Sequence, residues 1–309
     1  MKVYRSSAEA RGQLTAPAVA IGNFDGVHLG HQELFSRALA LARQAGGEAV
    51  ALTFDPHPAR FFNPELCPAL ITKESRKLEL MERAGLDAAV VEPFNADLAS
   101  LSPRDFAERV LARHLGARNV VVGEGFIFGR KRAGNLEALR RLGEELGFVA
   151  HGVVPVRAES IVVSSTKIRN FLFTGKVGGA ATLLGREYEV SGEVVRGKGR
   201  GRTIGVPTAN VVGDAEILPQ GGVYAGRVML PGGRLKDAVI NIGTNPTFEK
   251  AAVLSFEVHI LDFSEDLYGQ TLDVRFTRRL REEKKFSSVE ELLRAIHQDI
   301  EAAREILVG

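Results

Sequence analysis

The chain has 309 residues, of which 45% are hydrophobic and 25% charged, and its formal net charge at pH 7 is +2. These values are typical of a folded globular protein long enough for two domains, and so small a net charge does not favour nucleic acid or a membrane surface as a partner. One cysteine excludes an internal disulfide. With no secretory signal and no long apolar run, we expect a cytoplasmic protein without a membrane span.

The first distinctive segment combines a strand, a turn and a helix. Residues 17–21 are apolar and predict a buried strand, and Gly22 and Gly26 suit a sharp turn. Apolar residues then recur at helical spacing, and the apolar run 49–54 completes a strand–helix–strand unit. Such a unit places the start of a helix at the carboxyl end of a strand, where anions bind in parallel sheets.

Two histidines open this predicted helix. His28 and His31 are three residues apart, so they share one face of its first turn. Imidazoles can donate hydrogen bonds to phosphate oxygens and titrate near neutral pH. The residues alone leave phosphate chemistry, a metal pair and no role at all as alternatives, although His57 and Cys67 complete no recognisable metal motif.

Helices and strands continue to alternate up to about residue 156. A stiff loop is predicted at 53–58, where two prolines bracket His57. The alternation predicts a parallel sheet with helices on both faces. The predicted helices are 74–84, 103–115 and 136–146, and the predicted strands are 88–91, 119–123 and 149–156.

Hydroxyl and cationic side chains meet at the start of the next predicted helix. Ser165 and Thr166 suit a helix N-cap, which is their ordinary role. Lys167 and Arg169 add positive charge, which favours an anion at this helix start. A phosphate contact and a simple cap are both compatible with the residues.

The alternation of helices and strands ends near residues 175–186, and strands dominate after it. Closely spaced strands without helices between them predict a small antiparallel barrel, closed by a helix at 288–307. We therefore expect two domains, residues 1–185 and 186–309. The predicted strands are 188–195, 222–230, 237–242, 254–261 and 271–276.

Two adjoining segments of the second half suggest ligand chemistry. Residues 196–202 alternate basic residues with glycine, which fits either a solvated turn or a loop whose amides cover a polyphosphate. Thr208 and Asn210 follow in Pro-Thr-Ala-Asn, and their oxygens are of the hard type that Mg²⁺ accepts beside nucleotide phosphates. Aromatic stacking residues, which nucleic-acid binding favours, are missing from the basic segment.

Several of these segments resemble one known family. Gly-Asn-Phe-Asp-Gly-Val-His-Leu-Gly-His at 22–31 resembles the HxGH nucleotidylyltransferase signature, and more narrowly the amino-terminal half of the bifunctional prokaryotic riboflavin kinase/FAD synthetases. The segments at 53–58, 123–134 and 162–169 are similar to further motifs of that half. Pro-Thr-Ala-Asn at 207–210 and the segment 256–263 resemble riboflavin kinase motifs.

The resemblance implies a fold and two activities. It implies an α/β, Rossmann-like HxGH nucleotidylyltransferase domain, followed by a mainly-β riboflavin kinase barrel with a terminal helix. The kinase half would phosphorylate riboflavin to FMN with ATP and Mg²⁺. The first half would adenylylate FMN with a second ATP, giving FAD and pyrophosphate. ATP, riboflavin and FMN are the implied partners, without nucleic acid or membrane, and a weak homo-oligomer remains open.

The resemblance also assigns roles to residues. Glu257, His28 and His31 are the implied catalytic residues, and Phe54, His57, Phe128 and Arg281 are flavin-binding candidates. ATP or phosphate binding in the first half falls to Gly22, Phe24, Asp25, Gly26, Ser165, Thr166 and Arg169. In the kinase half it falls to Gly197, Gly199, Gly201, Thr208 and Asn210, of which Thr208 and Asn210 also bind the metal.

Two positions depart from the family pattern. Gly125 stands where the family usually has Asp or Asn, and Ile127 where many members have Arg. A kinase-only enzyme with an impaired adenylyltransferase half is therefore an alternative. A nucleic-acid-binding protein that uses the basic loop and the barrel is a second alternative, from a different class.

Overall fold

The computed structural model describes all residues except 198–200, 202–203, 214, 245–253 and 309. By its internal contacts the chain forms two compact units, Met1–Ser164 and Ser165–Gly309. The boundary expected at 185/186 falls within the second unit, just before its first barrel strand. Each unit is described by itself below.

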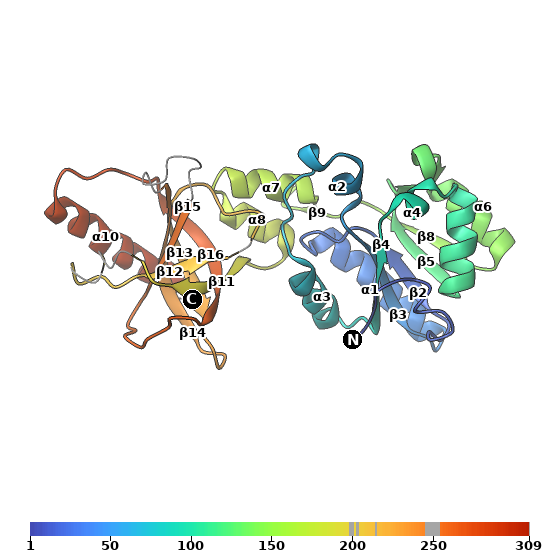
Figure 1. Ribbon diagram of the computed structural model, residues 1–309, viewed down its shortest axis with the longest axis horizontal. Coiled ribbons are helices and arrows are strands. Elements are labelled where there is room, and N and C mark those ends of the chain that lie inside the picture. Colours follow the sequence, from blue (N-terminus) through green and yellow to red (C-terminus); the bar gives the residue numbers. More distant parts are fainter. Residues whose placement is uncertain (198–200, 202–203, 214, 245–253, 309) are drawn as a thin grey trace. The chain divides into compact units, whose positions relative to one another are not determined.

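The first unit is built on a six-stranded parallel sheet (Figure 1). From the central strand β2 the chain adds β3 and then β4 on one side, and β5 and then β8 on the other. The strand order therefore reverses at β2, and ligands of such sheets usually bind at the carboxyl end of the strand where this happens. In spatial order the strands are β1 (Lys2–Tyr4), β4 (Ala88–Pro93), β3 (Ala49–Asp55), β2 (Ala18–Ile21), β5 (Asn119–Gly123) and β8 (Val149–Val153).

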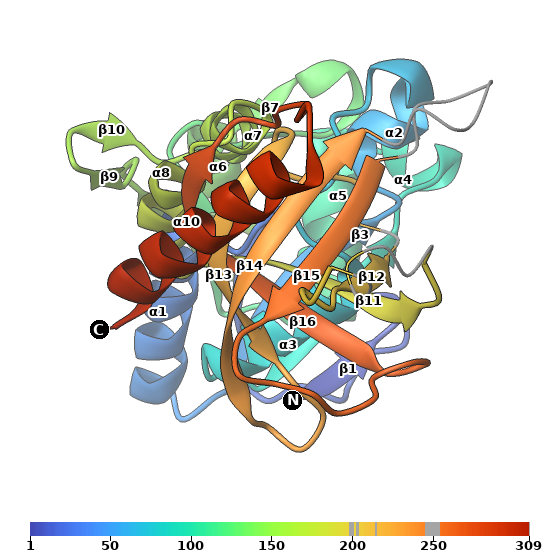
Figure 2. The same ribbon diagram turned by 90° about the vertical axis from the view of Figure 1, so that its left-hand side faces the viewer.

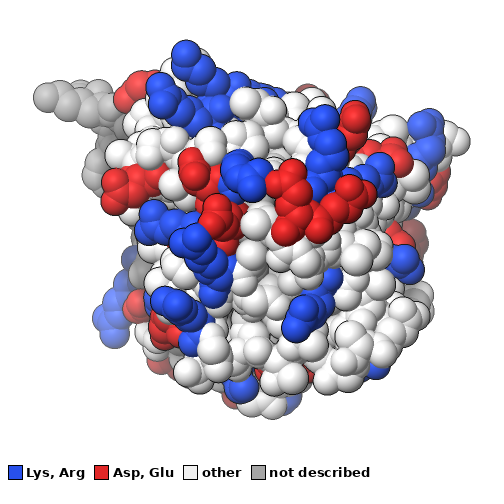
Figure 3. All heavy atoms as spheres, turned by 90° about the vertical axis from the view of Figure 1, so that its right-hand side faces the viewer, with Lys and Arg blue, Asp and Glu red and all other residues white. Residues whose placement is uncertain are grey.

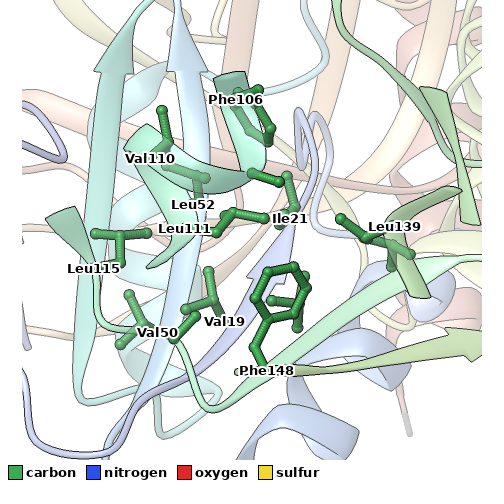
Figure 4. Packing of buried hydrophobic residues seen from close by; sticks show 14 of the residues in the cluster. Val19, Ile21, Val50, Leu52, Phe106, Val110, Leu111, Leu115, Leu139 and Phe148 are labelled. Atoms are coloured by element: carbon green, nitrogen blue, oxygen red, sulfur yellow. The ribbon is translucent and has the colours of Figure 1, made fainter. Parts of the chain in front are cut away.

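Helices cover both faces of this sheet, and the two faces differ in side-chain size. On one face α1 (Leu29–Gln44) and α3 (Glu74–Arg83) pack mainly over alanines of β2, β3 and β4. On the other, α5 (Pro103–Phe106), η2 (Ala107–His114) and α6 (Leu136–Leu146) pack over larger side chains, including Val19, Ile21, Val50 and Leu52 (Figure 4). Alternation along each strand produces this division.

The predicted α/β architecture is confirmed, with one local difference. The segment predicted as one helix at 103–115 is a short α-helix that continues as eight residues of π-helix, Ala107–His114. The smaller elements of the unit are α2 (Pro58–Phe62), η1 (Pro64–Leu66), α4 (Ala96–Ser100), β6 (Ile127–Phe128), η3 (Arg130–Arg132), β7 (Gly134–Asn135), β9 (Arg157–Ala158) and β10 (Ile161–Val162).

The second unit is a closed six-stranded barrel with helices outside it, which confirms the predicted barrel (Figure 2). All neighbouring strands are antiparallel. Around the barrel the strands are β11 (Tyr188–Val195), β12 (Ala209–Val212), β15 (Leu254–Ile260), β14 (Leu235–Thr244), β13 (Gly222–Met229) and β16 (Thr271–Arg281). Among its described residues the helices with defined bounds are α7 (Ser165–Phe173), α8 (Val177–Leu184) and α10 (Val289–Leu307).

Alternate residues of each barrel strand face inward. The interior is apolar, and Phe276 contacts the rings of Tyr188, Tyr224 and Phe256 there. Outside the barrel, α10 lies across β13 and β14 (Figure 2), where Ala303 and Leu307 pack on Val223 and Val239. Polar residues that alternate with the interior ones therefore lie on the outer wall, where a ligand can reach them.

Candidate functional site

The turn after β2 has a constrained backbone. Phe24 and Val27 have φ values of +52° and +41°, unusual for residues other than glycine, and Gly26 lies between them at +86°. A Cβ on Gly22 would lie 2.9 Å from the Phe24 ring, so this position requires glycine. Phe24 is fully buried, so its ring packs beneath the turn and does not face a ligand.

Asp25 fastens this turn to the segment that precedes α3. Its buried carboxylate accepts hydrogen bonds from the backbone N–H groups of Ile71 (2.9 Å) and Thr72 (3.1 Å). The N–H of Gly26 donates to the Thr72 hydroxyl at 3.0 Å. Asp25 and Gly26, predicted as phosphate-binding residues, thus have contacts that shape the turn.

The two histidines lie against each other at the start of α1. Their rings stack with centroids 3.5 Å apart, and His28 caps the helix by accepting the His31 N–H at Nδ1. This bond leaves the proton of a neutral His28 on Nε2, where it can be donated. A Cβ on Gly30 would lie 3.2 Å from the His28 ring, which accounts for glycine between the histidines.

His31 is held in its neutral form. Burial lowers its pKa well below 6.5, and the nearby His28 and Lys77 lower it further. Among the residues that the structure describes, its buried Nδ1 has no hydrogen-bond partner. An unpaired buried nitrogen beside this turn is available to a ligand.

The loop after β3 approaches the same turn. His57 caps α2, and its Nε2 lies 3.1 Å from the side-chain amide of Asn23. Phe54 contacts Phe94 edge-on, and Phe61 and Phe62 join them in one aromatic cluster. Phe62 is 68% exposed, so this cluster of edge-to-face rings presents an apolar surface at the carboxyl edge of β3 and β4.

Of this aromatic cluster, only Phe54 was predicted from the sequence. Phe61 and Phe62 lie in a helix too short to show an apolar period, and Phe94 follows a proline at a strand end. Phe128, also expected near the flavin, is buried in the core between Phe106 and Phe126. Its ring therefore stabilises the fold in this structure.

The third predicted phosphate segment belongs to the second unit. Ser165, Thr166 and Arg169 lie on α7, whose first residue is Ser165. The Arg169 side chain is buried, as is its neighbour Ile168.

The kinase candidates form a row across the outer wall of the barrel. Asn210 on β12 is the register partner of Glu257 on β15, and Glu257 is also the partner of Asn241 on β14. Their flanking residues Val211, Phe256 and Val258 face the interior, which places the three polar side chains outside. Asn241 was not predicted, because an asparagine in a strand gives no chemical signal without its register.

A glycine-rich backbone passes close to this row. A Cβ on Gly197 would lie 2.2 Å from Asn210 Nδ2, and one on Gly201 would lie 3.2 Å from Thr208 Oγ1. Glycine at 201 is required by the Val206 carbonyl oxygen, 2.4 Å from such a Cβ, and at 197 by the Asn210 side chain, so both glycines let backbone lie beside the two predicted metal ligands. Gly199 lies outside the described residues.

Two further contacts concern this wall. His259 Nδ1 lies 2.7 Å from the carbonyl oxygen of Pro207, directly before Thr208. Arg281 binds Asp299 of α10 through two nitrogens, at 3.0 Å and 2.8 Å, and lies over the Phe286 ring. Arg281 thus anchors α10, a contact that its predicted flavin role did not include.

Surface charge, the grouping of metal-binding side chains and helix length bear on other classes of function. The face drawn in Figure 3 interleaves Lys and Arg with Asp and Glu, without the continuous basic patch that nucleic acid favours. Within the part of the chain that the structure describes, no three His, Cys, Asp or Glu side chains form a metal site. No helix there is long and apolar enough to cross a membrane.

Comparison with known proteins assigns both halves. A family model for FAD synthetase matches residues 11–167, and one for riboflavin kinase matches residues 184–307. The chain thus joins a nucleotidylyltransferase domain to a kinase domain.

Similar proteins match over nearly the full length. The Pseudomonas fluorescens protein named bifunctional riboflavin kinase/FMN adenylyltransferase is 37% identical over 306 residues, 99% of this chain and 98% of that one. The Haemophilus influenzae protein of the same name is 34% identical, covering 98% of each chain. A Streptococcus pneumoniae crystal structure, titled as a macrolide-efflux protein, matches with a TM-score of 0.88 and 32% identity over 98% of both chains. The present chain belongs to the family of bifunctional riboflavin kinase/FMN adenylyltransferases.

Proposed function

We propose that this enzyme makes FMN on the barrel wall and converts FMN to FAD at the turn after β2. The row Asn210, Glu257 and Asn241 carries the first assignment, because it places a carboxylate between two amides on an outer surface beside a glycine loop. A base, polar anchors and backbone amides are the groups that phosphoryl transfer requires.

In the kinase step Glu257 accepts the proton of the riboflavin 5′-hydroxyl. The hydroxyl oxygen forms a bond to the γ-phosphorus of ATP while the bond to the β-phosphate oxygen breaks, and ADP leaves. The side-chain oxygens of Thr208 and Asn210 fit Mg²⁺, which would neutralise phosphate charge when bound with ATP. Gly197 and Gly201 let backbone amides approach the same phosphates.

In the adenylylation step a phosphate oxygen of FMN attacks the α-phosphorus of ATP, and pyrophosphate leaves. His28 donates from Nε2 and neutral His31 donates from one ring nitrogen to the phosphate oxygens, which stabilises their developing charge. Ser165, Thr166 and Arg169 are assigned to the triphosphate by family resemblance. The exposed rings of Phe61 and Phe62, with Phe54 and His57 nearby, offer a surface for the isoalloxazine.

The two reactions also define the substrates and the compartment of the enzyme. Its partners are ATP, riboflavin and FMN, and its place is the cytoplasm, where these compounds are made and used. Nucleic acid has no part in it, and Mg²⁺ is supplied with ATP.

One substitution separates the two activities. Glu257→Gln keeps the size of the side chain but removes the base, so FMN formation from riboflavin should fall by about 10² to 10⁴. FAD formation from supplied FMN should stay at the wild-type rate. Chromatography of riboflavin, FMN and FAD over time measures both, and equal loss of both activities would contradict two separate sites.

A further inference from the structure

A buried lysine lies behind the turn after β2. The Lys77 side chain belongs to α3, and the residue is only 9% exposed. Its Nζ donates to Thr53 Oγ1 at 3.2 Å and lies 3.5 Å from the carbonyl oxygen of Asn23. No carboxylate in the described part of the chain forms an ion pair with it.

Without a bound ligand, Thr53 and Asn23 do not need this ammonium group to be hydrogen-bonded. Thr53 Oγ1 already donates to the Asn23 carbonyl at 3.1 Å, so the Thr53 hydroxyl and this carbonyl stay bonded to each other without Lys77. Burying an ammonium group without a counter-ion is unfavourable. Burial accordingly lowers the pKa of Lys77.

The carboxylates around Lys77 have other partners. Glu74 forms an ion pair with Arg5 at 2.6 Å, and Asp25 accepts the backbone N–H groups of Ile71 and Thr72. Asp55, at the end of β3, acts on Lys77 only at longer range. A buried cation that lacks a close counter-ion is expected to gain one when an anion binds nearby.

The position of Lys77 indicates which kind of anion binds near it. Its nitrogen lies against Asn23, inside the turn that precedes His28, and its charge acts on His31. We propose that Lys77 supplies a fixed positive charge beneath this turn that attracts the phosphate chain of the nucleotide. It acts through its field rather than by contact, and the ligand class is a polyphosphate, either pyrophosphate or the triphosphate of ATP.

The inference rests on the proposed adenylylation site, and Lys77→Met tests it in the full-length chain. Methionine keeps the length and apolar stem of lysine but removes the charge. Lys2→Met is the matched control, because it removes one exposed lysine from the same unit. KM and kcat are measured for FAD synthesis with varied ATP, and for the reverse reaction with varied pyrophosphate.

The expected result is a rise in both KM values of about tenfold with little change in kcat. A unit charge acting over roughly 10 Å at an effective dielectric constant of about 20 has an effect of this size. Riboflavin phosphorylation should be unchanged in both variants. Without nucleotide, the thermal midpoint of Lys77→Met should equal or exceed that of the wild type, because the buried charge is gone.

Two outcomes would overturn the inference. Unchanged KM values for ATP and pyrophosphate would show that the charge does not reach the phosphates. A lower thermal midpoint of Lys77→Met without nucleotide would show that Lys77 stabilises the fold in the absence of ligand. If the wild type makes no FAD, the proposed function fails instead, and calorimetry with pyrophosphate still tests Lys77, since Lys77→Met should then bind pyrophosphate about tenfold more weakly than the wild type.

Discussion

A hydrogen bond from His259 holds the backbone directly before Thr208. His259 Nδ1 must carry a proton to donate to the Pro207 carbonyl, and this bond fixes the segment that presents Thr208 and Asn210. We predict that His259→Leu raises the Mg²⁺ requirement of the kinase by about tenfold to a hundredfold, as removal of a group that orients metal ligands does. His259→Asn keeps a donor at the δ position and should retain most activity in a magnesium titration. Equal activity of both variants would contradict this role.

The neutral state of His31 links stability to pH. In the unfolded chain its pKa returns to about 6.5, so below that pH the unfolded state binds a proton that the folded state excludes. Stability of the first unit should therefore fall as pH drops from 7 to 5, by up to about 1.4 kcal/mol per pH unit from this residue. His31→Gln should reduce that slope in denaturant unfolding. If the dependence of stability on pH is unchanged, it arises from His114 and His151, whose pKa values burial also lowers.

At the scale of elements, one ion pair fastens α10 to the barrel. Asp299 is 6% exposed and binds Arg281 at the end of β16. Asp299→Asn leaves the guanidinium without its counter-ion, and we predict a loss of about 2–3 kcal/mol, below the value for a fully buried pair because Arg281 is partly exposed. Asp262→Asn breaks an exposed pair with Arg304 on the same helix and should have no measurable effect in urea unfolding. Equal effects would refute the anchoring role.

The sequence predicted most elements but few contacts. Residues 17–21 and 119–123 were recognisable because strands buried on both faces are continuous apolar runs. Strand β12 was missed because Ala-Asn-Val-Val is only four residues long and has too few positions to show an alternating pattern. The same limit applies to the site, since the register that joins Asn241 to Glu257 and the pairing of Lys77 with Thr53 depend on residues far apart in the chain.

At the scale of the molecule, each unit has its own core. Leu111 is fully buried in the first unit and Ile240 in the barrel. Leu111→Ala should destabilise the first unit by about 2–5 kcal/mol, and Ile240→Ala the second by a similar amount. On heating, the first variant should lose FAD synthesis before riboflavin phosphorylation, and the second should show the opposite order. Loss of both activities together in both variants would show that the units unfold as one.

The outward position of Glu257 has a consequence for how this enzyme can change. Its neighbours Phe256 and Val258 fill the barrel, while Glu257 faces the solvent side. Odd-numbered positions of β15 thus determine catalysis, because Glu257 and His259 lie there, and even-numbered positions determine the packing of the barrel. A directed-evolution library confined to the even-numbered positions should alter thermal tolerance with little change in substrate turnover, whereas one confined to the odd-numbered positions should mostly lose kinase activity.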